Sequence, residues 1–421
     1  MTEHPPQPLA PPAPQDIARD IRPLRSVALA AAAVGLGLLA VGLLFLVDGD
    51  KQQAFFRSYL WAVVFWLGIP LGSLGLLMLQ HLTGGRWGLV TRRLLEAGTR
   101  MLPAMLVLFV PVLIFGMADI YDWYKKPGEI LAVHAEGVVN FKGWWLQPAF
   151  FLVRAAVYFG FWLLAMLLLN TWSDAQDRGG GDPGPARRMG VFSGPGLVAL
   201  VLTVTFAVFD WVMSIDAHWF STIYGLIFIV GQGLATLALA IIVLALIHRA
   251  PPLRDVVTRD HFHDLGTLMF AFTMLWAYMQ FSQFLIIWMG NIREETPFYI
   301  VRSHGLAGAL SVVLLVAGFF VPFLALLSRY AKRSVRMLVT AAVLILVMRV
   351  VDVFWLVKPA FAQHGLVHHG TIDQWWSVLD LATPLAVGGV FLWLFTGQVG
   401  RRPLLPPNDP RLAEALAGGH H

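Results

Sequence analysis

Five charged side chains lie within long apolar stretches of this chain or just at their ends: Arg154, Asp210, Arg349, Asp352 and Asp380. A charge placed in hydrocarbon costs about 2.5–3.5 kcal/mol on insertion scales, so it is kept only where it is paired, hydrated or used. Carboxylates of this kind either accept and release protons or form structural ion pairs. The sequence leaves both interpretations open, and it predicts polar machinery inside a membrane.

Arg349 and Asp352 are three residues apart, so their side chains share one face of a helix. At 1.5 Å per residue they lie about 20–25 Å from the cytoplasmic end of that helix. A satisfied ion pair is one interpretation. The other is a gate for proton release, in which Arg349 stabilises the ionised form of Asp352. Asp380, a short way into the last apolar stretch, could join this cluster.

A second group of titratable residues occupies the sequence FDWVMSIDAHWFSTIYG, residues 209–225. We expect Asp210 to end the fifth span, Asp216 and His218 to lie in a short outer turn, and Trp219 to open the sixth span. Three titratable groups this close together can relay protons. A tight turn that is capped by an Asp and anchored by an interfacial Trp explains the same residues without any relay.

The seventh apolar stretch also carries polar residues. Some lie at its cytoplasmic start, and others lie at mid-depth. Together with a histidine at the inner end of the second span, they could form a half-channel for proton uptake. Buried Gln and Ser often serve only to bind neighbouring helices, so this hypothesis also has a structural alternative. The candidates are His81, His261, His263, Asp264, Tyr278, Gln280, Ser282 and Gln283.

The elements that must position these residues are predicted to be membrane helices. The chain has 421 residues, of which 57% are apolar and only 13% are charged. Apolar runs of about 18–30 residues are long enough to cross a bilayer as helices. This composition predicts an all-α polytopic protein with ten spans, at 26–47, 58–82, 101–118, 148–171, 192–212, 219–248, 265–290, 305–327, 335–358 and 375–397.

The spans form one transmembrane domain, residues 26–398, between two tails. Residues 1–25 are rich in proline and are expected to be a disordered cytoplasmic tail, and residues 399–421 a second cytoplasmic tail. Most of the 30 Lys and Arg residues fall on the side of the two tails. The positive-inside rule therefore predicts that both termini are cytoplasmic. No soluble basic face exists, so nucleic-acid binding is not expected.

The residues that usually hold electron-carrying metals are scarce. The chain contains no Cys, which excludes disulfides, thiolate-bound iron–sulfur clusters and covalently attached c-type haem. A membrane b-type haem needs axial histidines well inside facing helices, whereas His81 and His248 lie at span ends. We therefore predict no metal and no covalently bound cofactor. If this protein takes part in electron transfer, the carrier is a diffusible quinone or belongs to a partner.

Three segments together resemble one family: LTGGRWG (residues 82–88), DWVMSIDAHWFSTIYG (210–225) and HDLGTLMFAFTMLWAYMQFSQFLIIWMGNIREET (263–296). They are similar to the membrane subunits of bacterial alternative complex III, a quinol:electron-acceptor oxidoreductase of respiratory or photosynthetic electron transport. These subunits belong to the polysulfide-reductase (NrfD-like) superfamily. The resemblance covers about residues 50–400, and the chain is similar to the smaller of the two ten-span subunits.

The resemblance implies two four-helix bundles plus two peripheral helices in a bacterial plasma (inner) membrane. It also implies quinol oxidation with proton release, using menaquinone or ubiquinone. The implied partners are a homologous ten-helix membrane subunit, an extracytoplasmic iron–sulfur protein and c-type cytochromes. The family's clearest quinol pocket belongs to the sister subunit, so no individual quinone ligand carries over to this chain.

Two other functions fit the same residues. A secondary transporter also has charges near the membrane midplane and helices interrupted by proline, although the sequence contains no convincing internal repeat. A passive anchor for a peripheral redox complex would use the buried charges only for structure. In that case, neutral replacements would change assembly but not turnover.

Overall fold

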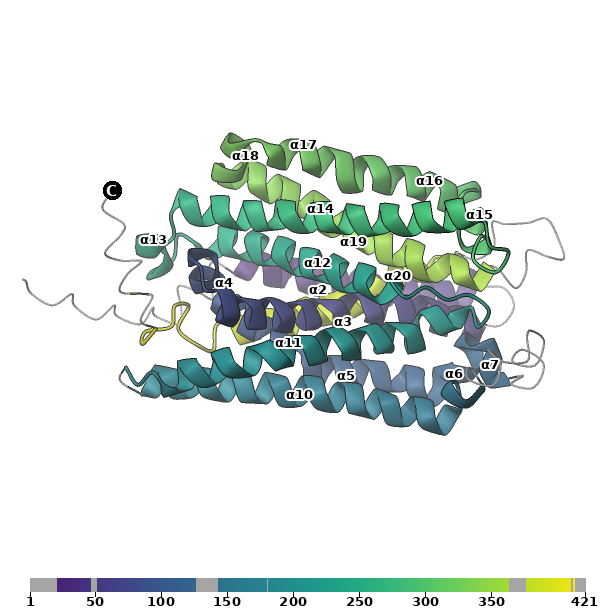
Figure 1. Cartoon of the computed structure of the whole chain (residues 1–421), viewed down its shortest axis with the longest axis horizontal. Coiled ribbons are helices and arrows are strands. Elements are labelled where there is room, and N and C mark those ends of the chain that lie inside the picture. Colours follow the sequence, from purple (N-terminus) through teal and green to yellow (C-terminus); the bar gives the residue numbers. More distant parts are fainter. Residues whose placement is uncertain are drawn as a thin grey trace, which may run out of the picture.

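The computed structural model describes residues 21–46, 51–125, 143–179, 181–362, 376–409 and 412, so most of the predicted N-terminal tail and the last part of the predicted C-terminal tail lie outside these ranges. Ten helices within them are long and apolar enough to cross a membrane, which confirms the predicted all-α polytopic fold (Figure 1). In chain order they are α2 (Arg22–Val41, continued by the π-helical η1, Gly42–Leu46), α3 (Lys51–Thr83), α4 to α6 (Arg86–Ile120), α10 (Pro148–Arg178), α11 (Gly184–Trp211), α12 (Tyr224–Ile247), α14 (Arg259–Gly290), α16 to α17 (Gly305–Leu327), α19 (Val335–Val357) and α20 (Leu379–Val399).

The third span differs most from its predicted bounds. It was expected to begin at residue 101, but helix α4 (Arg86–Thr99) starts a full four turns earlier. Apolar run length could not reveal α4, because the segment carries Arg92, Arg93 and Glu96 in its interior. All three are buried against other helices, where ion pairs satisfy them. Helix α5 (Leu102–Pro111), the π-helical η2 (Val112–Gly116) and α6 (Met117–Ile120) complete the span.

The spans group into two bundles, as expected. Helices α3, α5, α10 and α11 pack against one another, and so do α12, α14, α17 and α19. Contacts of α12 with α3 and α11 join the two groups. Helices α2 and α20 form a closely packed pair beside α3, and Figure 1 shows α14, α17 and α19 on one side of this centre and α10 and α11 on the other.

Small residues bring the central helices together. A Cβ atom on Gly72 of α3 would lie 2.3 Å from Thr236 Oγ1 of α12, and one on Gly35 of α2 would lie 2.3 Å from the backbone nitrogen of Ala386 in α20. Only glycine therefore permits these approaches. In a membrane, where lipid is as apolar as a leucine side chain, such close packing is a main source of helix association.

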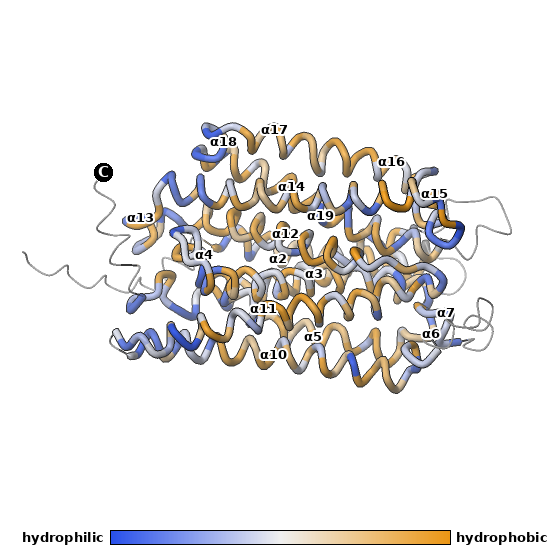
Figure 2. Tube along the Cα trace, in the orientation of Figure 1, coloured by the Kyte–Doolittle hydropathy of each residue, from blue (hydrophilic) through white to orange (hydrophobic). Residues whose placement is uncertain are grey.

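The two ends of the molecule carry different short elements. Helix α13 (Leu253–Val256), helix α18 (Arg329–Arg333) and residues 400–409 lie at one end, which we call the basic end. Helix α7 (Asp122–Lys125) and helix α15 (Pro297–Arg302) lie at the other, called the opposite end. Figure 2 shows hydrophilic residues concentrated at both ends and hydrophobic residues between them. An even number of spans returns the chain to the basic end, which is the side predicted to be cytoplasmic.

Candidate functional site

Arg349 and Asp352 form a buried ion pair on α19, here called the α19 pair. Their exposed fractions are 3% and 0%, and the Arg349 guanidinium donates to Asp352 Oδ2. Gln280 of α14 donates from Nε2 to the other carboxylate oxygen at 3.2 Å. The guanidinium carbon of Arg349 also lies 4.7 Å from the centre of the Trp276 ring. Two helices therefore hold this carboxylate, and each of its oxygens accepts from a different side chain.

A large pocket opens beside the α19 pair. It has a volume of about 810 Å³ and lies between α14, α15, the α16 region with its π-helical continuation η4 (Leu314–Phe320), and α19. Most of its wall is apolar or aromatic, including Phe281, Phe284 and Phe320. The polar side chains that line it are Tyr278, Gln280, Tyr299, Arg302, Ser303, Ser311 and Asp352. We call it the acid-lined pocket.

Arg302 fixes one wall of the acid-lined pocket. Its three guanidinium nitrogens donate to backbone carbonyls of Trp355 at 3.1 Å, Phe298 at 2.9 Å and Leu356 at 2.8 Å. Two of these acceptors belong to the last turn of α19, where carbonyls lack helical partners and a cation is favourable. The guanidinium also lies 3.6 Å from the centre of the Phe298 ring. Arg302 thereby ties α15 to the end of α19.

Burial changes the acid–base properties of this wall. It lowers the pKa of Arg302 to about 10, against partial compensation from nearby Tyr224, Tyr299 and Asp216. It also raises the pKa of the Tyr299 hydroxyl, which therefore stays protonated and able to donate a hydrogen bond at neutral pH. At neutral pH the wall of the acid-lined pocket therefore carries the Arg302 cation and the neutral phenol of Tyr299, near the opposite end of the molecule.

Helical spacing explains which α14 residues reach the site. Trp276, Gln280 and Gln283 follow one another at steps of four and three residues, so they share one face of α14. Gln283 is 2% exposed and lies further along this face toward the opposite end. Tyr278 lines the pocket while 67% of its side chain is exposed, which places it where the pocket opens to the molecular surface.

The remaining predicted half-channel residues are not brought together with these. His263 and Asp264 contact each other at the basic end, with 3.6 Å between Nδ1 and Oδ1. Sixteen residues, or about 24 Å of helix, separate Asp264 from Gln280. His261 caps the start of α14 through Thr258, and His81 lies near the end of another helix, α3.

Arg154 and Asp210 form a second buried ion pair, between α10 and α11. Arg154 donates from Nε to Asp210 Oδ2 and from Nη2 to Oδ1, both at 2.8 Å. Trp145 Nε1 donates to Oδ1 at 2.7 Å and the Tyr158 hydroxyl to Oδ2 at 2.8 Å. The Arg154 guanidinium carbon lies 4.1 Å from the centre of the Trp145 ring. Four donors on two oxygens satisfy this carboxylate, so the arrangement is that of a structural tie.

The turn between α11 and α12 differs in detail from its prediction. Helix α12 begins at Tyr224, so Trp219 lies in the turn and does not open the sixth span. Asp216 Oδ1 accepts from the backbone N–H groups of His218 at 3.0 Å and Trp219 at 3.3 Å. This is the capped turn that the sequence offered as the structural alternative. The Trp219 ring stacks on Phe298 at 4.3 Å, which connects the turn to α15.

Asp380 has other partners than those expected. Its Oδ1 lies 2.9 Å from Lys358 Nζ and accepts from Trp61 Nε1 at 3.1 Å, and its Oδ2 accepts from the backbone of Ser377 at 2.8 Å. None of these partners belongs to the α19 pair. Helix α20 starts at Leu379 beside α3, so Asp380 ties α3 and α20 to the end of α19 instead of joining Asp352. Lys358, at the end of a predicted span, carried no sequence signal of a buried partner.

The largest buried ionic network was also missed. Glu96 is 0% exposed and accepts from Arg92 at 3.0 Å, Arg93 at 2.7 Å and Ser173 at 2.6 Å. Arg402, far along the chain, lies 3.3 Å from the same carboxylate. The spacing of Arg92, Arg93 and Glu96 at three and four residues was the available signal. The sequence predicts no span between residues 82 and 101, so this spacing was not read as helical.

The described residues contain no group of three or more His, Cys, Asp or Glu side chains that could hold a metal ion. The comparison with known protein families finds no family that matches the sequence, and the comparison with curated proteins finds no match either. The arrangement of the side chains must therefore support any functional conclusion. An apolar pocket with a few convergent polar groups is a typical site for a small lipophilic molecule.

Proposed function

We propose that this chain is the smaller membrane subunit of an alternative complex III, a quinol:electron-acceptor oxidoreductase in a bacterial plasma membrane, and that quinol is oxidised at the acid-lined pocket. The observation that carries this proposal is the placement of the Asp352 carboxylate on the wall of an apolar 810 Å³ pocket. That volume falls within the usual range for small-molecule sites, about 300–1,000 Å³.

The chemistry of the pocket suits a quinol. A quinol combines an apolar aromatic ring and an isoprenoid tail with two hydroxyl groups. The aromatic walls accommodate the ring, and the opening near Tyr278 leads the tail to the lipid. Asp352 accepts a proton from one hydroxyl, while Gln280 and the protonated Tyr299 offer hydrogen bonds to the oxygens. Arg349 stabilises the carboxylate in its ionised form before the proton is transferred.

The position of the acid-lined pocket supports release of protons at the opposite end of the molecule. Asp352 is five residues from the end of α19, about 7–8 Å along the helix axis. Oxidation of one quinol to quinone yields two protons and two electrons. We assign the electrons to partners, namely an extracytoplasmic iron–sulfur protein and c-type cytochromes that dock with a homologous ten-helix subunit. This chain contributes residues that handle the protons.

A passive anchor is the second candidate, and the Arg154–Asp210 pair favours it. All four donors around Asp210 come from neighbouring side chains, which is what a purely structural acid requires. If Asp352 serves the same purpose, then its replacement should affect assembly only. The two acids therefore provide a matched comparison, because both are buried and paired with an arginine, whereas only Asp352 lines the acid-lined pocket.

The test is to purify the complex in mild detergent with its partners and measure decylubiquinol oxidation per assembled complex. Haem absorption bands and an iron–sulfur subunit should travel with the chain. Loss of a general base typically lowers turnover by about 10²–10⁴-fold, and this is the expected effect of Asp352→Asn. Asp210→Asn should reduce the amount of complex but leave turnover per complex unchanged. Normal turnover in the Asp352→Asn complex would refute the proposal and favour the anchor.

A further inference from the structure

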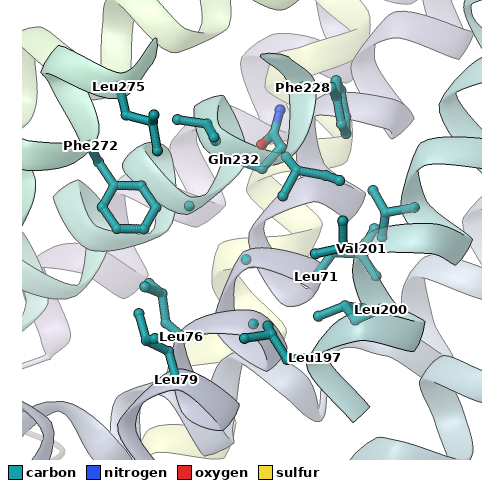
Figure 3. Close-up of a pocket in the computed structure, with 16 residues that line it drawn as sticks. Leu71, Leu76, Leu79, Leu197, Leu200, Val201, Phe228, Gln232, Phe272 and Leu275 are labelled. Atoms are coloured by element: carbon teal, nitrogen blue, oxygen red, sulfur yellow. The ribbon is translucent and has the colours of Figure 1, made fainter. Parts of the chain in front are cut away.

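A second pocket lies between the two helix bundles, where α3, α11, α12 and α14 meet (Figure 3). Its volume is about 240 Å³, and we call it the inter-bundle pocket. Among the described residues that line it, Gln232 is the only one with a polar side chain. It shares no lining residue with the acid-lined pocket, because α14 presents Phe272 and Leu275 to one and Gln280 and Phe281 to the other.

The Gln232 carboxamide is buried and unpartnered. The residue is 2% exposed, and neither its Oε1 nor its Nε2 has a hydrogen-bond partner within the described part of the chain. Helix α3 packs closely around it, since a Cβ on Gly68 would lie 2.1 Å from the amide oxygen. A buried amide without partners is costly, and hydrocarbon offers it no water. Because Gln232 lines the inter-bundle pocket, a molecule bound there could supply the missing hydrogen-bond partner.

The chemistry of the wall restricts that molecule. Gln232 is eight residues into α12, about 12 Å from its start, so the pocket lies at hydrocarbon depth and its ligand must come from the lipid phase. No charged side chain lines the pocket among the described residues, so an ionic head group would be unmatched. Water alone is a poor occupant, because it needs two to four polar partners. An amide both donates and accepts, which matches a hydroxyl or a carbonyl.

We propose that the inter-bundle pocket binds a neutral, lipid-soluble molecule whose hydroxyl or carbonyl group forms hydrogen bonds with Gln232. Two membrane sources share this chemistry: a long-chain or isoprenoid alcohol, and the ring of a quinone or quinol. This inference does not depend on quinol oxidation at the acid-lined pocket, because the two pockets are lined by different residues.

The test uses the full chain in nanodiscs of synthetic phosphatidylcholine. A decanol that bears a photoreactive diazirine is compared with the matching diazirine decane, and labelled peptides are mapped by mass spectrometry. The alcohol should label the peptides around residues 71–79 and 228–233 about three- to tenfold more than the alkane, as expected for one net hydrogen bond. Equal labelling of these peptides by the two probes would refute recognition by Gln232.

Two variants and one control make the assignment specific. Gln232→Leu should lower labelling by the alcohol to the level of the alkane without loss of thermal stability, because it removes only an unpartnered amide. Gly75→Leu should block both probes, because a Cβ there meets only Leu200 at 3.5 Å and the longer side chain fills the pocket. The control is Gln283→Leu, which removes another buried glutamine with an unpartnered oxygen that lines neither pocket, and it should leave labelling of the inter-bundle peptides by the alcohol unchanged.

Competition then identifies the source of the ligand. Displacement of the probe by unlabelled decanol supports a membrane alcohol, and displacement by decylubiquinone at lower concentration supports a quinone ring. Labelling that survives both Gln232→Leu and Gly75→Leu would overturn the proposal, whatever its competition profile. Failure of decylubiquinol turnover in the Asp352→Asn complex is a separate result and leaves this inference standing.

Discussion

Removing the cation from the Arg154–Asp210 pair should destabilise the protein far more than an exposed charge substitution would. In Arg154→Met, the Asp210 carboxylate stays 1% exposed but loses both 2.8 Å hydrogen bonds from the guanidinium. It keeps only the neutral donors of Trp145 and Tyr158. Breaking a buried ion pair by removing one partner costs about 3–5 kcal/mol, because a charge is left uncompensated.

The size of the thermal shift follows from the length of the chain. An unfolding entropy of about 2.1 cal/mol/K per residue gives about 0.9 kcal/mol/K for 421 residues. A loss of about 4 kcal/mol should therefore lower Tm by about 4–5 °C. Adding Asp210→Asn removes the stranded charge. We expect the double variant to be more stable than the sum of the two single effects by at least about 2 kcal/mol.

The assay is thermal unfolding followed by tryptophan fluorescence, in one detergent and at one scan rate, for the wild type, both single variants and the double variant. Arg254 and Asp255 provide the control, since their side chains are 66% and 54% exposed at 3.5 Å. Replacing Asp255 with Asn should shift Tm by less than about 1 °C. Additive effects in the cycle, or a shift in Arg154→Met no larger than that of the control, would refute the structural role assigned to Arg154.

Three further outcomes follow from the buried groups. Glu96→Gln removes the central anion from a cluster of arginines, so we expect a loss of about 3–5 kcal/mol and faster trypsin cleavage between Arg401 and Arg402; an unchanged cleavage rate would contradict this. Gly68→Ala places a Cβ 2.1 Å from the Gln232 amide and should lower stability by about 1–3 kcal/mol. Adding Gln232→Ala should restore stability, and a double variant as unstable as Gly68→Ala alone would show that the clash lies elsewhere. Burial lowers the pKa of Arg302 to about 10, which lies below its unfolded value, so the cost of burying this charge is fully present below about pH 10 and is relieved only above it. The Tm difference between the wild type and Arg302→Met should thus be constant from about pH 6 to 9, and a slope in that window would show that another group is titrating.

Local spacing made one part of the candidate site predictable. Arg349 and Asp352 lie three residues apart, and helical geometry alone places them on one face, where the structure finds them in contact. The same rule could have identified Glu96 with Arg92 and Arg93. It failed because the helix that contains them, α4, is not apolar enough to be recognised as part of a span.

Pairs that join distant segments were beyond local reasoning. Arg154 and Asp210 were both noted as buried charges, yet nothing in their positions indicated that they bind each other across α10 and α11. Asp380 pairs with Lys358, which follows the end of α19, and nothing in the spacing of these two distant residues indicated that they meet. The inter-bundle pocket depends on four helices, and its defining side chain, Gln232, carries no sequence signal at all.

The sequence by itself determined that the chain forms ten membrane helices. A backbone in hydrocarbon must satisfy its own polar groups, so every sufficiently long apolar run becomes a helix whatever lies beside it. Only the tertiary structure decided which helices touch, and hence which carboxylate meets which cation and where the two pockets open. Those contacts depend on small residues and on polar side chains that meet across helices, and such meetings leave no periodic trace in any single segment.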